Sequence, residues 1–173
     1  MKHILMIIAN KGFQDLEFWN PYHLFLDKWY HIDIASGKGG ECFWVFWTHI
    51  EHSLSFEEVE VKKYDALVFV WGGGTYEEYN NDPQYLALAK QAENILAAIC
   101  IAPSILSKSW LFKGKEITGR DDGEGTEISI MKQNGAIFIP QDVVRDNNII
   151  TACWPEASVA FGHTIIEALE ENL

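Results

Sequence analysis

The chain has 173 residues, 48% of them hydrophobic, and a formal net charge of -12 at pH 7. Its length predicts a single domain over residues 1–173 that can bury a core without disulfides or a metal. The acidic balance excludes a nucleic-acid or anionic-membrane surface, since both need clustered Lys and Arg, and no apolar stretch approaches the roughly 20 residues of a membrane span.

The three cysteines, Cys42, Cys100 and Cys153, are odd in number and widely spaced. They form neither a disulfide framework nor a zinc-binding pattern, so we expect no metal and no cofactor. Residues 1–10 have a basic start, but their apolar run is typical of a first strand rather than a secretory signal. We therefore expect a protein of the reduced cytoplasm that acts on a small molecule.

Short apolar runs alternate with helical spacings along the chain. The predicted strands cover residues 4–9, 31–35, 43–47, 64–71, 95–99, 143–145 and 149–152. The predicted helices cover residues 15–29 with Pro21 inside, 83–94, a stretch after Cys100 that reaches Ser109, 124–133 and 155–169. This alternation is typical of an α/β fold, a three-layer α/β/α sandwich around a mostly parallel, flavodoxin-like sheet.

Cys100 is the most informative residue of the sequence. The apolar run 95–99 ends there, and Ala102, Pro103 and Ser104 are typical of a helix start. A side chain on such a strand-to-helix turn is exposed at the carboxyl edge of the sheet, which is the geometry of a nucleophile elbow. The amides and dipole of the helix favour the thiolate, so we expect a lowered thiol pKa. The alternative is a buried structural cysteine.

A run of three glycines, Gly72 to Gly74, follows the predicted strand 64–71. Ligands bind at the carboxyl ends of parallel strands, and glycine lets a backbone approach a ligand closely. The run is therefore a candidate binding loop, and the alternative is a plain glycine turn.

Five segments, in this order and at these spacings, resemble the ThiJ/PfpI superfamily, a group with a class I glutamine amidotransferase-like fold that contains the parkinsonism-associated deglycase. The segments are NKGFQDLEFWNP (10–21), YDALVFVWGGG (64–74), AAICIAPSIL (97–106), FKGKEIT (112–118) and RDNNIITA (145–152). The resemblance covers nearly the whole chain and implies the fold, but it does not specify a substrate.

The resemblance implies that Cys100 is a nucleophile with Glu17 beside its sulfur. A carboxyl next to a thiolate cannot also be an anion without a large penalty, so Glu17 would be protonated and act as general acid or base. The amides of Gly73 and Ile101 would form an oxyanion hole, with the register of the glycine run open by one residue. The alternative for Glu17 is an acidic residue that stabilises a helix start.

Two positions depart from the pattern of the superfamily. Many relatives carry histidine directly after the cysteine or two residues past the threonine of FKGKEIT, where this chain has Ile101 and Arg120. No Cys-His pair is therefore visible in the sequence. We expect His49, His52 and His163 at the surface or in the core.

The remaining candidates for substrate binding are Gly72, Gly74, Glu77 and Arg120. A guanidinium near Cys100 would stabilise a thiolate and bind a carboxylate or phosphate of a ligand. The alternative for Arg120 is a salt bridge to an acidic residue within 121–124. The alternative for Glu77 is a surface charge.

Four aromatic residues fall within five positions: Phe43, Trp44, Phe46 and Trp47. They predict either a buried strand or hairpin, or a subunit interface. Because the relatives are commonly dimers or higher assemblies, we expect a homodimer or a higher homo-oligomer. Cys42 is expected to be a core or interface thiol, and Cys153 is a conceivable redox partner of Cys100.

Three functions remain open for this site. The first is a cysteine-dependent enzyme of the ThiJ/PfpI type, of the glyoxalase, deglycase or hydrolase kind, that acts on a small carbonyl, amide or ester compound. Peptidase activity is its least favoured variant, since amide leaving groups demand a general acid. The second is a non-catalytic oxidation sensor that uses the thiol of Cys100. The third is a small-molecule binding module without turnover.

Overall fold

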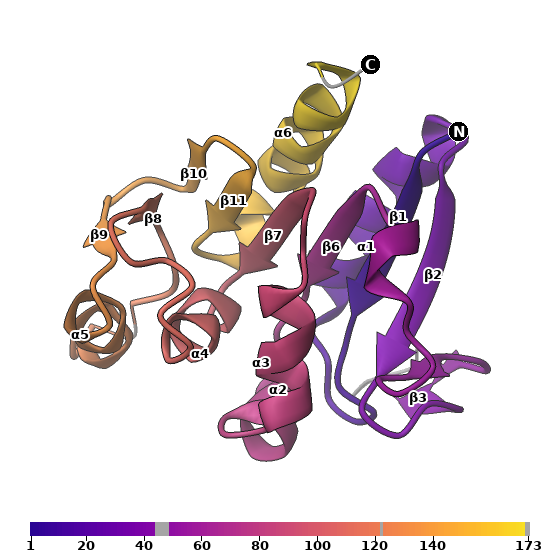
Figure 1. The fold of residues 1–173 in the computed structure, drawn as a ribbon, viewed down its shortest axis with the longest axis horizontal. Helices are drawn as coiled ribbons and strands as arrows, with labels where there is room; N and C mark the ends of the chain where they lie inside the picture. The colour runs from indigo at the N-terminus through magenta and orange to yellow at the C-terminus, as the bar shows by residue number, and fades with distance from the viewer. Residues whose placement is uncertain (44–48, 122, 172–173) are drawn as a thin grey trace.

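The computed structural model describes residues 1–43, 49–121 and 123–171. They form three layers, with helices on both faces of a central sheet (Figure 1). The order of the seven strands is β10-β11-β7-β6-β1-β2-β5. In chain order they are β1 (His3–Ile7), β2 (His31–Ser36), β5 (Leu54–Ser55), β6 (Ala66–Phe69), β7 (Ile95–Ile99), β10 (Val143–Asp146) and β11 (Ile149–Ala152). All neighbouring pairs are parallel except β10 and β11, so the predicted mostly parallel sheet is confirmed.

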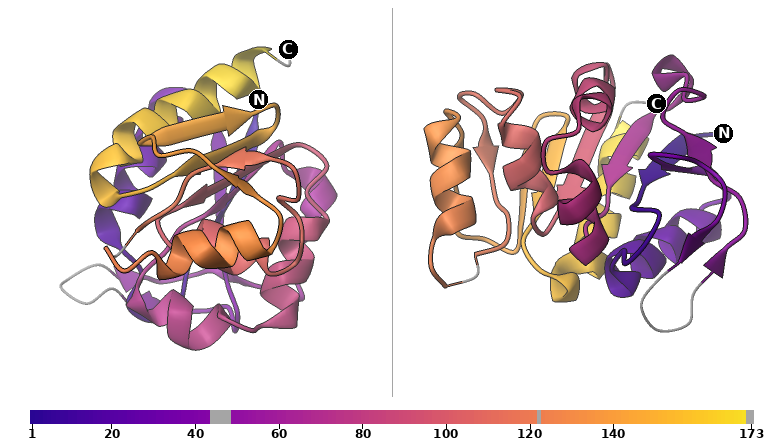
Figure 2. Two further views of the ribbon diagram at one scale, coloured as in Figure 1. Left: turned by 90° about the vertical axis from the view of Figure 1, so that its left-hand side faces the viewer. Right: turned by 90° about the horizontal axis from the view of Figure 1, so that it is seen from below.

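Six α-helices accompany the sheet within the described residues: α1 (Asp15–Asp27), α2 (Gly73–Tyr79), α3 (Pro83–Lys90), α4 (Ala102–Ser107), α5 (Thr126–Gln133) and α6 (Ser158–Glu171). Helices α1 and α6 cover one face of the sheet, and α3 and α4 cover the other (Figure 2). Two 3-10 turns complete the described helical structure, η1 (Val61–Lys63) and η2 (Pro155–Ala157).

The central strands are buried on both faces because helices cover the sheet on either side. All residues of β6 and β7 are buried, and so is β1 apart from His3. Continuous apolar runs are typical of such strands. The register pairs Phe69 of β6 with both Ile7 and Ala98, so the carboxyl ends of β1, β6 and β7 lie side by side. This edge of the sheet is opposite the N- and C-terminal marks of Figure 1.

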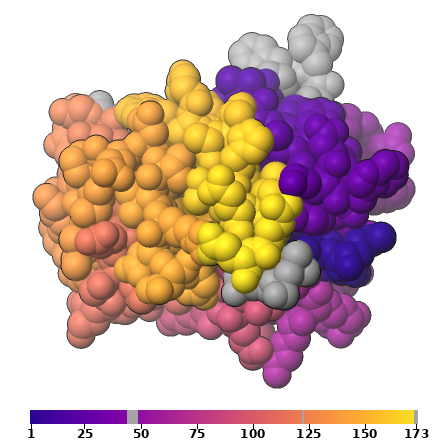
Figure 3. Space-filling model, turned by 90° about the horizontal axis from the view of Figure 1, so that it is seen from above, coloured from indigo at the N-terminus to yellow at the C-terminus, as the bar shows by residue number. Residues whose placement is uncertain are grey.

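Helix α1 continues through Pro21 rather than ending there. Pro21 is buried, and a Cβ placed on Gly162 of α6 would come within 3.2 Å of its Cα. Helices α1 and α6 therefore approach each other closely where Pro21 meets Gly162. Figure 3 shows α6 lying across this side of the molecule, between the orange C-terminal segments and the indigo N-terminal ones.

Several details differ from the sequence-based expectations. The glycine run, expected as a binding loop or a plain turn, instead forms the start of helix α2. Two small sheets flank the main one, an antiparallel pair of β3 (Cys42–Phe43) with β4 (His49–Ile50) and a parallel pair of β8 (Glu116–Ile117) with β9 (Ile137–Phe138). Of the predicted strand 43–47, Phe43 lies in β3, and the remaining residues lie outside the described residues. Within the part of the chain that is described, no helix is long and apolar enough to cross a membrane.

Candidate active site

Cys100 lies on a strained turn between β7 and α4. Its φ angle is 66°, in the left-handed region that non-glycine residues seldom adopt. The backbone is fixed on both sides, since its amide donates to the carbonyl of Ala152 and its carbonyl accepts from the amide of Arg120, each at 2.8 Å. The predicted strand-to-helix elbow is thus present in the structure.

The exposure predicted for Cys100 is wrong. The residue is 2% exposed rather than extended into solvent. The loop after β8 packs over the elbow, and a Cβ placed on Gly119 would lie 3.2 Å from the Cys100 carbonyl oxygen. Ser104 lies in the first turn of α4, in keeping with the predicted helix start, and donates its hydroxyl to the carbonyl of Ile101.

Glu17 comes from the first turn of α1 and is 0% exposed. The side chain of Gln14 caps this helix by accepting from the amide of Glu17 at 3.0 Å. Glu17 Oε2 accepts from the amide of Trp71 at 3.2 Å, just past β6. Its other oxygen, Oε1, is buried and has no hydrogen-bond partner among the described residues. The helix start and the strand end thus bring this carboxyl to the thiol of Cys100, with which it interacts.

Burial sets the protonation of this pair. It raises the pKa of Glu17 from an ordinary value of 4.5 to about 8, although the interaction with Cys100 and the amide of Trp71 act in the opposite direction. The carboxyl is therefore protonated at neutral pH, as the sequence predicted.

The pKa of the Cys100 thiol differs from the expectation. Burial raises its pKa well above that of a free thiol, and the Glu17 carboxylate raises it further. The guanidinium of Arg120 and the amide of Ile101 lower it without compensating for burial. The predicted low-pKa thiolate is wrong, because the elbow is buried. The pair instead holds both protons at neutral pH and loses the first near pH 8, which makes it one coupled acid–base unit.

The glycine run has two different environments. A Cβ on Gly72 would lie 2.2 Å from the carbonyl oxygen of Gly12, and one on Gly74 would lie 1.6 Å from that of Lys11. These two glycines allow close packing of the chain against itself. A Cβ on Gly73 would meet nothing within 4 Å. Gly73 therefore borders open space at the start of α2, where the first amides of a helix have no partner within the helix.

Arg120 lies between two tryptophan rings. Its guanidinium carbon is 5.6 Å from the ring centroid of Trp71 and 5.3 Å from that of Trp154. The nearby carboxylate of Asp121 accepts instead from the amides of Gly123 and Gly125, at 3.1 and 3.0 Å. Neither tryptophan was predicted from the sequence as a site residue. The sequence did hold a signal for them, because Trp71 closely follows β6 and Trp154 closely follows β11, and both strands end at the carboxyl edge of the sheet.

The other predicted candidates are not brought to Cys100 by any contact of the described residues. Glu77 is exposed on α2. His49 stacks on Phe43, with ring centroids 4.9 Å apart, and His163 is exposed on α6.

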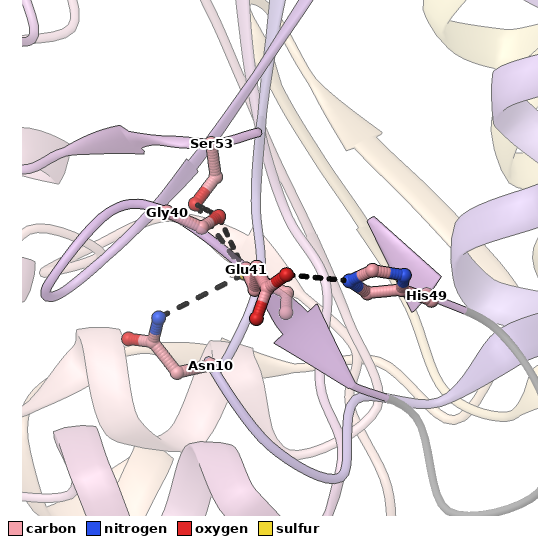
Figure 4. Close-up of polar contacts among 6 residues, drawn as sticks. Asn10, Gly40, Glu41, His49 and Ser53 are labelled. Carbon is pink, nitrogen blue, oxygen red and sulfur yellow. Dashed lines mark hydrogen bonds and ion pairs between the residues drawn. The ribbon is translucent and has the colours of Figure 1, made fainter. Parts of the chain in front are cut away.

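Cys42 is buried in a polar cluster of its own, separate from Cys100. Ser53 Oγ lies 3.3 Å from its sulfur, and Asn10 Nδ2 lies 3.9 Å away. Figure 4 shows Asn10, Gly40 and Ser53 gathered beside Glu41, whose carboxylate pairs with His49 at 3.4 Å.

Cys153 follows β11 and donates to Asp142 Oδ1 at 3.6 Å. Burial, together with that carboxylate, raises its pKa to about 11. A cavity of about 300 Å³ opens beside it and is also lined by Gln141 and Trp154. All three cysteines are free thiols. In the described part of the chain, no group of three or more His, Cys, Asp or Glu is placed to hold a metal ion.

The profile of the DJ-1/PfpI family matches residues 2–168, which is nearly the whole chain. The chain belongs to the DJ-1/PfpI family. It is 33% identical over 172 residues to the uncharacterised protein MJ0967 of Methanocaldococcus jannaschii, covering 98% of this chain and 83% of that one. It is 28% identical to Deglycase PfpI of Pyrococcus furiosus, covering 96% and 99% of the two chains.

A solved structure shows the same fold. The ThiJ/PfpI domain protein from Brachyspira murdochii superposes with a TM-score of 0.89 at 24% identity, over 98% of this chain and 96% of that one. The predicted superfamily and fold class are thereby confirmed. Within this fold, the elbow, the buried carboxyl and the two-tryptophan cradle meet at the sheet edge where the open α/β sheets bind ligands.

Proposed function

We propose that this chain is a cysteine-dependent enzyme that acts on a small carbonyl, amide or ester compound, with Cys100 as nucleophile and Glu17 as proton acceptor and donor. The observation that carries the proposal is the strained residue at φ 66° beside a fully buried carboxyl. Strained backbone and strongly perturbed acids concentrate at functional sites. The deglycase name of the Pyrococcus furiosus relative supports chemistry at a small carbonyl group.

The pair can supply the nucleophile without a histidine. Above about pH 8 the carboxylate of Glu17 accepts the proton of the Cys100 thiol while sulfur attacks the carbonyl carbon. The carbonyl π electrons move to oxygen, where the amides of Ile101 and Gly73 would hold the developing charge.

With an ester, the alkoxide then leaves and takes the proton from Glu17. Water hydrolyses the thioester, which releases the acid and restores the thiol. Because the base is a buried carboxyl with a pKa near the working pH, its protonation state is poised for proton transfer.

The structure is less favourable to the oxidation sensor. Oxidation to the sulfinate selects accessible thiols of low pKa. Cys100 is 2% exposed and its pKa is raised by burial. The binding module uses the same site and differs from the enzyme only in turnover. The homodimer or higher homo-oligomer stays a prediction.

The proposal is tested by turnover of two probes, hydrolysis of 4-nitrophenyl acetate and consumption of methylglyoxal. We expect Cys100→Ser to lose activity by about 10³-fold or more, because a hydroxyl is far less acidic than a thiol and is a far weaker nucleophile. Cys42→Ser is the matched control, a buried cysteine away from the site, and should retain activity within about threefold. Turnover that survives Cys100→Ser would contradict the proposal, and wild-type protein inert toward both probes would favour the binding module.

A further inference from the structure

Two buried donors beside Cys100 lack partners. Arg120 Nε and Trp71 Nε1 are both inaccessible to solvent, and neither has a hydrogen-bond partner within the residues that the structure describes. Buried polar atoms are nearly always hydrogen-bonded, so two orphan donors at one place require an explanation. Both belong to residues that contact the Cys100–Glu17 pair, through the carbonyl of Cys100 for Arg120 and the carboxyl of Glu17 for Trp71.

The guanidinium of Arg120 is held in place before any ligand arrives. Its backbone amide is bonded to Cys100, and two residues earlier Thr118 is buried with its amide bonded to Thr151 Oγ1 at 2.8 Å. The rings of Trp71 and Trp154 then flank the guanidinium. Cation–π contact with aromatic rings uses the charge of a guanidinium and leaves its N–H groups able to bind an anion. Little side-chain entropy remains to be lost when an anion binds at that edge.

The positive charge of Arg120 is unusual in so acidic a protein. The protein carries 25 Asp and Glu residues against 13 Lys and Arg, yet a guanidinium faces the reacting pair. Its effect on the pKa of both Cys100 and Glu17 places it within electrostatic reach of each. The carboxylate of Asp121, its sequence neighbour, is engaged by turn amides.

We propose that the substrate of this site is a carbonyl compound that also carries a carboxylate, which the N–H edge of Arg120 binds beside Cys100. The proposal rests on the proposed function, whose nucleophile it uses. A carboxylate matches the fork of the guanidinium through two parallel hydrogen bonds. The indole N–H of Trp71 is the second donor at the site. Arg120 thus selects an anionic substrate and positions its carbonyl group for attack.

Alkylation of Cys100 by two nearly isosteric reagents tests this without requiring turnover. Iodoacetate and iodoacetamide present the same electrophilic carbon, and they differ in carrying a carboxylate or a neutral amide. In both reactions a sulfur–carbon bond forms, the carbon–iodine bond breaks with release of iodide, and the thiol proton passes to the buffer. The rate is followed at Cys100 alone by digestion and mass spectrometry, at constant ionic strength.

We expect the rate with iodoacetate to saturate with concentration and to exceed that with iodoacetamide by at least about tenfold, since prior binding orients the reagent. Acetate should slow only the iodoacetate reaction. Arg120→Met should lower the ratio of the two rates by at least about tenfold, because the charged hydrogen bonds are lost. Taking the ratio cancels any effect of Arg120 on the thiol itself.

Arg145→Met is the matched control. It removes the other arginine of the chain, which forms a surface pair with Glu171 at 2.6 Å, and it should leave the ratio within about twofold. A ratio that is unchanged in Arg120→Met, or a faster reaction with iodoacetamide in the wild type, would overturn the inference while leaving Cys100 as nucleophile. Failure of both reagents to modify Cys100 in the folded protein would overturn the proposed function and the inference together.

Discussion

Cys100 and Cys42 are both buried thiols near the carboxyl edge of the sheet, yet their surroundings differ. Cys42 is 0% exposed and Cys100 is 2% exposed. Cys42 lies in a regular strand among the neutral polar groups of Ser53 and Asn10. Cys100 has a left-handed backbone and faces the buried carboxyl of Glu17.

The difference shows that burial alone does not identify a reactive cysteine. Burying a neutral thiol among satisfied dipoles costs little and carries no chemistry. Burying a carboxyl next to a thiol on a strained backbone is unfavourable for stability, and such arrangements persist chiefly where they have a function. The carboxyl, rather than the depth of burial, is what distinguishes Cys100.

Removing the carboxyl is the strongest test of this comparison. Glu17→Gln keeps the shape of the side chain and an oxygen for the amide of Trp71, but it cannot exchange a proton. We expect kcat/KM to fall by about 10²-fold, the usual contribution of one positioned acid–base group. In the wild type, activity should rise with pH through about 8 as Glu17 loses its proton, and this inflection should disappear in the variant. The measurement is the pH profile of 4-nitrophenyl acetate hydrolysis from pH 5 to about 9.

Asp15→Asn is the control for that experiment. Asp15 lies in the same helical turn and its charge raises the pKa of Glu17. Its removal should move the inflection to lower pH and keep kcat/KM at the plateau within about threefold. A pH profile of hydrolysis that is unaltered in Glu17→Gln would mean that Glu17 is not the acid–base group of the site. The carboxyl would then not distinguish Cys100 from Cys42.

The stability of the protein should also depend on Glu17. Its pKa is about 8 in the folded chain against an ordinary value of 4.5, so between these values the folded state holds a proton that the unfolded state has lost. This stabilisation is complete below pH 4.5 and is lost as the pH rises to about 8. Its slope is at most about 1.4 kcal/mol per pH unit for one proton.

Urea denaturation at a series of pH values measures this slope. The free energy of unfolding of Glu17→Gln should decline less steeply than that of the wild type across the same window. Cys42→Ser should follow the wild-type slope. Parallel slopes for the wild type and Glu17→Gln would show that the carboxyl is not buried in its neutral form.

The smallest effects are expected at Cys42. Cys42→Ser should cost no more than about 1 kcal/mol, because the neighbouring hydroxyl of Ser53 and amide of Asn10 can hydrogen-bond to the new hydroxyl. Cys42→Val should cost more, about 1–3 kcal/mol, since it removes a polar partner and adds volume in a packed site. Chemical denaturation of both variants measures the difference. A larger loss for serine than for valine would show that the cluster is apolar in character.

Most of the architecture was predictable from the sequence. The run 95–99 coincides with β7, and Asn147 and Asn148 form the turn between β10 and β11, since a buried strand and a tight turn each have a local signature. Helix α2 was missed because its first two residues are glycines, which disfavour helices intrinsically. The packing of Gly72 and Gly74 against the loop after β1 overrides that preference.

The main residues of the site were predictable from the sequence, but the pKa of its thiol was not. Cys100 and Glu17 were identified from their motifs, and the structure brings them together. Burial raises the pKa of the thiol, and the elbow is packed against segments distant in sequence, such as the loop around Gly119 at the carbonyl of Cys100. The cradle of Trp71 and Trp154 around Arg120 likewise unites three separate segments, and no local pattern reports such a contact.

The left-handed backbone of Cys100 implies a trade-off between stability and activity. A glycine would adopt its φ of 66° without the steric cost, roughly 1 kcal/mol, that a side chain incurs there. Hydrogen bonds to Ala152 and Arg120 fix the main chain at this position whatever side chain it carries. The chain therefore gives up stability at one residue to retain a thiol, and its fold tolerates that loss because the neighbouring strand and loop, not the cysteine, determine the shape of the turn.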